Sequence, residues 1–424
     1  MLTATSGSKF SKIDFDLCAL AANSFLVLAL FILLDPFYTG HGAFRVSRDI
    51  GPLKYVPLFF GLLGIVFYIY GITRRNNSGA VLSIIQKYFF VILFGLIVLG
   101  GSIYAREVNG VQETFLQLAL ATLGFLLAIL FYWSVENRFS LVERTLWLLA
   151  LSIPYVATWV VLKRIEDGQA FHTEIFLFIP LMVFFSLRVK SKLIAFIFFI
   201  SLITLGVLTK KNTGYLVTLI SSVYVMILFF DKTLSALSRV KKMFLVFIAF
   251  SVFLILLAVV GFLLVYREDY LPSGSAHVRM DAYRTMWAMF LSSPIYGQLF
   301  SETTLVQLGT NAVFGQNKVI THSDALDILA HGGVIGFIIF SIAVGKPVFH
   351  AYKLLKIMSP SRTSAYIHGL VAIVICGLVT ALFNSPLLTF PIAVIFWFCL
   401  GLLCCILEDI RIQLRSSNFI SNSR

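Results

Sequence analysis

A histidine and two glycines follow one another at the start of an apolar segment late in the chain. The run T-H-S-D-A-L-D-I-L-A-H-G-G-V-I-G places ten residues between His322 and Gly333, and Gly336 follows three positions later. Thr321 is a potential helix N-cap with Asp324 as its capping-box partner, which puts His322 in the first turn of a predicted helix. The positive end of the helix dipole disfavours a charged imidazole there, so His322 is predicted to stay neutral near pH 7 and able to accept a proton. The alternative is that His322 only caps or solvates the end of a loop.

Arg279 lies upstream, on a segment with a broad apolar face. Residues 277–291, H-V-R-M-D-A-Y-R-T-M-W-A-M-F-L, gather Met, Tyr, Trp, Phe and Leu on one side of a helix, with Arg279 and Arg284 at polar positions. The pattern predicts an amphipathic helix in the membrane interface, with Tyr283 and Trp287 at headgroup level. A guanidinium can donate hydrogen bonds to one phosphate from two N–H groups. On such a helix, Arg279 and Arg284 can also do no more than contact lipid phosphates.

Two adjacent lysines form a third candidate. Lys210 and Lys211 occupy the turn T-K-K-N-T-G, residues 209–214, between two apolar runs. The orientation predicted below places this turn outside the membrane, where basic residues are less frequent. The pair can bind an anionic substrate, or it can be tolerated because the loop is short.

Long apolar runs must position all of these residues. Of the 424 residues, 59% are hydrophobic and 12% are charged, and the mean hydropathy is +0.93. Soluble domains carry about 25% charged residues, so a soluble fold is excluded. We expect an all-α polytopic membrane protein with about twelve transmembrane helices in one integral domain, 1–424, and a long outward loop with interfacial helices at 267–332. The predicted spans are 16–34, 55–72, 87–104, 114–133, 145–162, 175–187, 193–209, 215–230, 243–266, 333–349, 365–383 and 391–407.

The charge distribution predicts the orientation. The formal net charge is +13, from 33 Lys and Arg against 20 Asp and Glu. In a soluble protein this excess would point to nucleic acid as a partner. Cytoplasmic loops of membrane proteins collect Lys and Arg, so no nucleic-acid partner is expected, both termini are predicted to be cytoplasmic, and the long loop faces outward. The five cysteines all lie in apolar runs without the spacing of a metal site, so no metal is expected.

The histidine motif resembles that of the O-antigen ligase and O-antigen polymerase family of bacterial inner membranes. The family pattern of His, ten residues, Gly, two residues and Gly is similar to His322, Gly333 and Gly336, and Ser323 fits the Asn or Ser that commonly follows the histidine. The resemblance is strongest over residues 205–350.

Two further family motifs have counterparts. An Arg, an aromatic residue four positions on and a later Pro-x-x-Gly are similar to Arg279, Tyr283 and the stretch Pro294 to Gly297, with Tyr where Trp is commoner. A Ser-Arg-Gly-like turn corresponds to 209–214, with lysine in place of arginine.

The resemblance implies a GT-C-like, metal-independent, inverting glycosyltransferase without a cofactor. Its donor would be a glycan on undecaprenyl pyrophosphate at the periplasmic face of the inner membrane. Arg279, with Lys210 or Lys211, would stabilise the pyrophosphate leaving group, and His322 would be the base for the acceptor hydroxyl. Tyr283 and Arg284 are further substrate-binding candidates, and membrane lipid and a chain-length regulator protein are expected partners.

Two products fit this pattern. A polymerase joins one lipid-linked unit to another, and a ligase transfers the finished chain to lipid A core. The shared motifs do not separate the two, and polymerase is the preferred prediction. Rival classes are a lipid-linked oligosaccharide transporter, which would place ionisable residues along a central cavity, and a protein with only an assembly role.

Overall fold

The computed structural model describes most of the chain, and several predictions fall in its gaps. His322, Lys210, Lys211 and the predicted span 243–266 lie outside the described residues. The described residues are 9–34, 55–109, 113–153, 175–189, single positions between 193 and 205, 212–234, 275–300, 305–307, 318–320 and 323–422.

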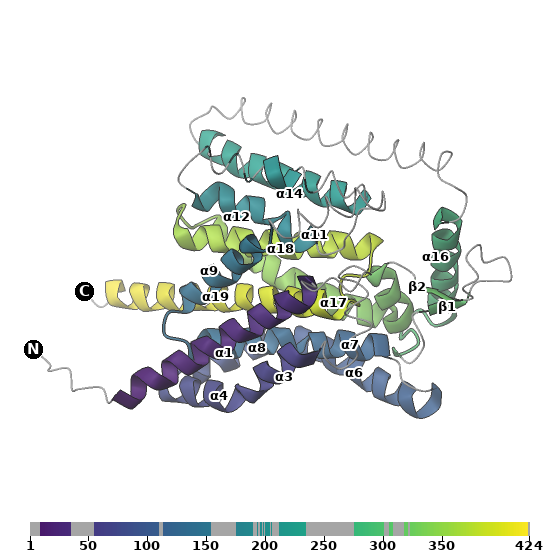
Figure 1. Ribbon diagram of the computed structural model, residues 1–424, viewed down its shortest axis with the longest axis horizontal. Coiled ribbons are helices and arrows are strands. Elements are labelled where there is room, and N and C mark those ends of the chain that lie inside the picture. Colours follow the sequence, from purple (N-terminus) through teal and green to yellow (C-terminus); the bar gives the residue numbers. More distant parts are fainter. Residues whose placement is uncertain are drawn as a thin grey trace, which may run out of the picture.

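These residues form helices and one short strand pair (Figure 1). In the first half of the chain the helices are α1 (Lys9–Leu34), α3 (Val56–Leu63), α4 (Ile65–Arg74), α5 (Ser78–Lys87), α6 (Phe89–Asn109), α7 (Glu113–Ala121), α8 (Leu123–Ser134), α9 (Arg138–Leu151), α11 (Ile175–Phe178) and α12 (Leu181–Arg188). In the second half the elements are α14 (Asn212–Leu234), α16 (Ser275–Ser292), β1 (Leu305–Gln307), β2 (Lys318–Ile320), α17 (Asp324–Leu355), α18 (Arg362–Phe383) and α19 (Phe390–Asn422). The all-α prediction is confirmed, with the strand pair as an addition.

Helix α19 runs through the centre of the bundle. Its first half is apolar on every side, and such a helix is stable only when other helices surround it. Small residues bring α8 and α19 close together. A Cβ at Gly124 would lie 2.5 Å from the carbonyl oxygen of Val394, and one at Gly401 would lie 2.7 Å from that of Phe125. Close backbone contact of this kind replaces the hydrophobic driving force that lipid does not supply.

Four segments are long and apolar enough to cross a membrane, and two bent helix pairs bring the number among the described residues to as many as six. The four are Phe115–Ser134, Asp324–Leu355, Arg362–Phe383 and Phe390–Arg415. The pair α3 and α4 is bent by 40°, and the pair α5 and α6 by 67°. The prediction of about twelve spans is therefore not confirmed. The predicted spans 145–162, 193–209 and 243–266 lie wholly or partly outside the described residues.

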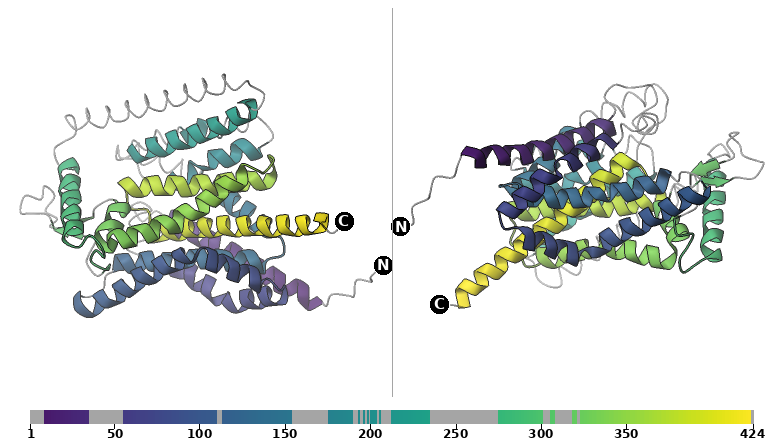
Figure 2. Two further views of the ribbon diagram at one scale, coloured as in Figure 1. Left: turned by 180° about the vertical axis from the view of Figure 1, so that it is seen from behind. Right: turned by 90° about the horizontal axis from the view of Figure 1, so that it is seen from below.

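The helix predicted over 277–291 is present as α16. It lies at one end of the bundle and runs across the direction of the long helices (Figures 1 and 2). Ala282 and Met286 are buried, whereas Trp287 is 50% exposed. One face is thus covered and the other open, as expected of an interfacial helix.

The predicted long loop, 267–332, contains the two short strands β1 and β2. The strands pair antiparallel, with Leu305 opposite Ile320 and Gln307 opposite Lys318. Strands of three residues are too short for alternation to be read from sequence.

Helix α17 begins later than predicted. Its N-cap is Ser323, not Thr321: the backbone of Ser323 is extended, and its hydroxyl accepts a hydrogen bond from the backbone N–H of Leu326 at 3.3 Å. Asp324 is therefore the first helical residue, and His322 precedes the helix instead of lying in its first turn. Ser is preferred to Thr at an N-cap, which agrees with the observed start of the helix at Ser323.

The bundle has two ends, which are named here by the elements that lie at them. We call the end that carries α16 and the start of α17 the loop end, and the end at which α19 finishes the C-terminal end (Figure 1). From Phe390 at the loop end to Glu408, α19 rises about 27 Å. This is close to the ~30 Å thickness of a bilayer hydrocarbon core.

Candidate active site at the loop end

Two glycines from separate motifs lie in direct backbone contact. Gly297 has φ +62° and Gly333 has φ +60°, and a Cβ at Gly297 would lie 2.5 Å from the backbone nitrogen of Gly333. Both space and conformation therefore exclude a larger side chain. The backbone N–H of Val334 also donates to the carbonyl oxygen of Pro294 at 2.8 Å. We call Pro294, Gly297, Gly333 and Val334 the glycine clasp.

The clasp explains the kink in α17. Gly333 leaves the helical conformation, with ψ −168°. The next N–H groups, of Val334 and Ile335, then bond to the carbonyl oxygens of Pro294 and Ile295. A helix start leaves its first N–H groups without acceptors, and here the turn after α16 supplies them. The first part of α17, Asp324 to Gly332, is thereby set at an angle to the part that spans the bundle.

Phe300 anchors the same turn in the bundle. Its side chain is fully buried, with ring centroids 5.2 Å from Phe115 and 6.3 Å from Phe94. Its backbone N–H donates to the carbonyl oxygen of His331 at 3.1 Å. A Cβ at Gly332 would lie 2.8 Å from the Phe300 ring. The turn is therefore held at both ends, by the clasp and by this ring.

Helix α16 rests on the first part of α17. Ala282 and Met286 form a small apolar cluster with Ala330, and Met289 and Leu326 pack against it. The carboxyl end of α16 leads into the clasp near Gly333.

Arg279 is on the same helix, three residues before Ala282 in the sequence. Tyr283 is half-buried and Arg284 is exposed. The helix that carries the arginine motif thus lies against the helix that follows His322.

A set of hydrogen bonds joins three segments beside the start of α17. Oδ2 of Asp324 accepts from the backbone N–H of Leu387 at 2.6 Å. The backbone N–H of Asp324 donates to the carbonyl oxygen of Asn384 at 3.2 Å. The side-chain amide of Asn384 bonds to the hydroxyl of Thr213, near the start of α14. We call Thr213, Asp324, Asn384 and Leu387 the polar hub.

The polar hub relates two predicted site segments to each other. Thr213 follows Lys211 by two positions, and Asp324 follows His322 by two positions. The structure therefore brings together the elements that flank the lysine pair and the histidine, and α16 adds the element that carries Arg279. The contacts of Lys210, Lys211 and His322 themselves lie outside the described residues.

Sequence reasoning missed the buried polar residues of this end. Asp324, Asp327 and His331 are 0% exposed, and Asn384 is 5% exposed. Neither ring nitrogen of His331 has a hydrogen-bond partner among the described residues, and its ring packs 4.7 Å from that of Phe115. The available signal was the spacing D-A-L-D-I-L-A-H, which repeats polar groups every three or four positions along an otherwise apolar helix.

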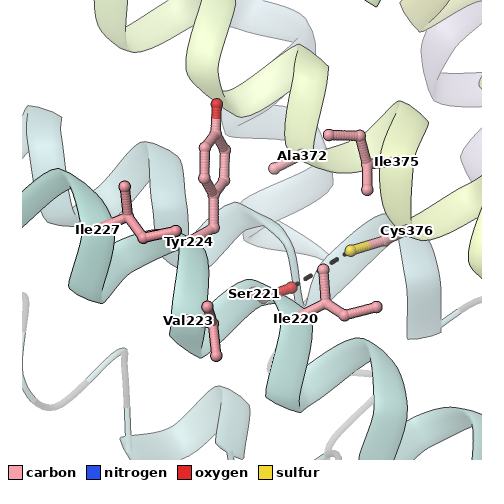
Figure 3. A pocket seen from close by; sticks show the side chains of 8 residues that line it. All are labelled: Ile220, Ser221, Val223, Tyr224, Ile227, Ala372, Ile375 and Cys376. Atoms are coloured by element: carbon pink, nitrogen blue, oxygen red, sulfur yellow. Dashed lines mark hydrogen bonds between the residues drawn. The ribbon is translucent and has the colours of Figure 1, made fainter. Parts of the chain in front are cut away.

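A hollow of about 180 Å³ lies elsewhere, between α14 and α18 (Figure 3). Ile220, Ile227, Ala372 and Ile375 line it, and the hydroxyl of Ser221 contacts the thiol of Cys376 at 3.4 Å. Among the described residues, its lining includes no carboxylate, lysine or arginine. The hollow suits a hydrocarbon group and not charge transfer, so the loop end remains the candidate site.

The fold and this site define a class: an all-helical membrane protein with a polar site at one end of its bundle. The family model described as "O-Antigen ligase" matches residues 196–341, about a third of the chain. The matched range holds α16, the glycine clasp and all the candidate site residues. This match bears out the resemblance to the O-antigen ligase and polymerase family over residues 196–341. A comparison with curated proteins found no match.

Proposed function

We propose that the protein is a periplasmic-face glycosyltransferase that polymerises undecaprenyl-pyrophosphate-linked repeat units into O-antigen or a related surface polysaccharide. The observation that carries the proposal is the glycine clasp, because it joins the arginine motif and the histidine motif of the matched family. Motif residues far apart in sequence gain a shared function only if the fold brings their elements to one place.

The proposed reaction is a single displacement at the anomeric carbon. The acceptor hydroxyl oxygen forms the new bond to that carbon as the bond from the carbon to the pyrophosphate oxygen breaks. The electron pair leaves with the pyrophosphate, whose charge Arg279 and Lys210 or Lys211 stabilise. His322 takes the hydroxyl proton and later releases it to water. Attack opposite the leaving group inverts the configuration.

Tyr283 and Arg284 are proposed to contact the glycan or the lipid headgroup. They lie on α16, Tyr283 half-buried and Arg284 exposed, at the level where the sugar of a membrane-anchored donor would meet the bilayer surface. The apolar surroundings of the bundle suit a substrate whose polyprenyl tail stays in lipid.

The proposed location is the bacterial inner membrane, with both termini in the cytoplasm and the loop end in the periplasm. The ion-paired lysines and arginines of the C-terminal end support this orientation, since cytoplasmic ends collect basic residues. A chain-length regulator protein remains a proposed partner.

A deletion strain tests the proposal and separates its alternative. Loss of a polymerase leaves lipid A core that bears a single repeat unit. Loss of a ligase leaves bare core, with polymer still attached to undecaprenyl pyrophosphate. The banding pattern of the lipopolysaccharide distinguishes the two, and an unchanged pattern would reject both.

A further inference from the structure

Helix α17 carries a stripe of basic side chains where it approaches the C-terminal end. Lys346, His350 and Lys353 stand at positions i, i+4 and i+7, and residues at these spacings share one face of a helix. From Gly333, at the kink of α17, Lys346 lies about 20 Å along the helix axis and Lys353 about 30 Å. A bilayer hydrocarbon core is about 30 Å thick. The basic stripe therefore reaches the level at which lipid headgroups begin.

Contacts with α5 and the residue after it hold the basic stripe in place. Nζ of Lys346 donates to the backbone carbonyl oxygen of Lys87, the last residue of α5, at 2.5 Å. The hydroxyl oxygen of Tyr88 lies 3.1 Å from Nδ1 of His350. An ammonium group has three N–H donors, so Lys346 keeps N–H groups for a further acceptor.

The charges around the basic stripe do not balance. Glu408 is already paired, with Lys87 at 2.9 Å and with Arg411 at 3.7 Å. Within the described part of the chain, no carboxylate forms an ion pair with Lys346 or Lys353. These two lysines nevertheless lie within electrostatic range of the same imidazole as the two paired cations. Several cations grouped at a membrane surface attract an anion.

The surroundings of the basic stripe favour a lipid over a soluble anion. Phe349 is exposed on the same helix, and Phe89, which follows Tyr88, is exposed at the start of α6. Nζ of Lys353 lies 4.4 Å from the centroid of the Phe349 ring. Aromatic and basic side chains together are typical of the membrane interface. Exposed rings beside N–H donors suit a molecule that carries both acyl chains and a phosphate.

We propose that Lys346, His350 and Lys353 bind the phosphate of an anionic glycerophospholipid, such as phosphatidylglycerol, in the leaflet at the C-terminal end. The two ammonium groups donate to phosphate oxygens. With Tyr88 donating to Nδ1, the imidazole carries its proton on Nε2, which is a third donor. The acyl chains pack against Phe349. The lipid site is remote from the loop end and does not depend on the proposed reaction.

The alternative is that the lysines are solvated and only help to orient the protein in the membrane. Native mass spectrometry of the purified full-length protein in detergent separates these roles. The probe is dioleoyl phosphatidylglycerol, and dioleoyl phosphatidylcholine has the same acyl chains without a net charge. We expect the first phosphatidylglycerol to bind about tenfold more tightly than the first phosphatidylcholine. Equal affinities for the two lipids would overturn the proposal.

Substitutions in the basic stripe locate the binding. Lys353→Gln removes one exposed charge and should weaken phosphatidylglycerol binding about fivefold. Lys346→Gln keeps an amide donor for the carbonyl oxygen of Lys87, and both substitutions together should reduce the affinity to that for phosphatidylcholine. Thermal unfolding without added lipid checks that each variant is folded. Lys353→Gln alone decides the question if the double variant does not fold, because wild-type affinity in it would contradict the lipid site.

A matched control is Lys356→Gln, on the same helix and with the same loss of charge. Lys356 stands ten residues after Lys346, outside the i, i+4, i+7 spacing, and its Nζ lies 4.5 Å from the centroid of the Tyr352 ring. We expect its affinity for phosphatidylglycerol to equal that of the wild type. If Lys356→Gln and Lys353→Gln weaken binding equally, the attraction is diffuse and the proposal fails.

A last arm distinguishes a lipid from a free phosphate. Inorganic phosphate and glycerol 3-phosphate offer the same phosphate oxygens without acyl chains, so they lack the apolar part of the binding. We expect neither of them, at millimolar concentration, to displace bound phosphatidylglycerol. Displacement by either one would show that the site takes a soluble anion and would overturn the assignment to a lipid.

Discussion

The buried acidic side chains at the two ends of the bundle differ in how completely they are paired. At the C-terminal end, Glu408 is paired with Lys87 at 2.9 Å, and Asp409 is bonded by Tyr132 at 3.0 Å and by Arg138 at 3.3 Å. At the loop end, the described partners of Asp324 leave one carboxylate oxygen open, and His331 has none for either ring nitrogen.

The difference between the buried acidic groups distinguishes the two ends. A satisfied buried ion pair fixes helices but has no capacity left for another group. Open buried polar atoms lower stability, and they persist where they serve binding or catalysis. Changes at the loop end should therefore reduce activity more than stability, and changes at the C-terminal end should do the reverse.

The largest effect is expected at the proposed base. His322→Ala should abolish chain extension in cells, because the acceptor hydroxyl loses its proton acceptor. Immunoblots of membranes should show normal abundance of the variant. Surface polysaccharide of normal length and amount in this strain would contradict the assignment of the base.

The second largest loss of activity is expected from a substitution in the glycine clasp. Gly333→Ala adds a Cβ at φ +60°, within 2.5 Å of the backbone nitrogen of Gly297. The turn must shift, and a shift of about 1 Å at a catalytic site can cost about 10²-fold in rate. Gly345→Ala in the same helix is the control, since nothing lies within 4 Å of a Cβ at Gly345. Equal polymer synthesis by the two variants would show that the clasp does not position the site.

A substitution at the C-terminal end should reduce stability and leave activity unchanged. Glu408→Gln leaves Lys87 without its buried partner, and we expect the free energy of unfolding to fall by about 3 kcal/mol. Turnover per folded molecule should stay unchanged. Thermal unfolding in detergent measures the first quantity and initial rates measure the second, with the exposed Glu136→Gln as control. A loss of kcat without a loss of stability in Glu408→Gln would contradict the proposed division of stability and activity between the two ends.

A smaller effect is expected at the cation of α16. Arg279→Lys keeps the charge but loses the two hydrogen bonds that a guanidinium can donate to one phosphate. We therefore expect kcat/KM to fall about tenfold, equivalent to about 1.4 kcal/mol. Arg411→Lys, on the exposed side of the C-terminal end, is the control. Wild-type kinetics for Arg279→Lys would leave Arg279 as a lipid anchor.

The smallest effect concerns acid stability. Burial alone would raise the pKa of Glu143, but hydrogen bonds from Arg362 and Arg188 hold this pKa below its ordinary value. A lowered pKa means that the contribution to stability is present above the unfolded-state pKa and is lost as pH falls through the folded-state pKa. Because Arg362 is mostly exposed, the contribution should be about 1 kcal/mol or less. The difference in Tm between wild type and Glu143→Gln should be present at pH 7 and shrink toward acid pH. A constant difference would contradict this account.

Local pattern predicted much of the loop end but not its contacts. The apolar periodicity of 277–291 predicted α16 to within two residues of its observed bounds. The N-cap of α17 was placed two residues early, at Thr321, although Ser is preferred to Thr at an N-cap, and at the observed start Asp324 accepts a hydrogen bond from Leu387. Local sequence patterns do not predict this contact, because the two residues are far apart in the chain.

The same limit applies to the membrane spans and the buried acids. Hydropathy finds apolar runs, but it does not report that α5 and α6 meet at 67° or that α3 and α4 bend at Gly64. Asp324 was predicted only as a capping-box partner, and a carboxylate is usually exposed. Its burial follows from packing against 384–388, a contact that only the fold creates.

The two glycines in backbone contact have a consequence for how such proteins can diversify. The chain between Phe300 and Ser323 leaves from the point that Phe300 anchors and returns at the N-cap of α17. That stretch holds His322, so we expect sequence changes in it that keep His322 to be tolerated while the contact between Gly297 and Gly333 holds α16 against α17.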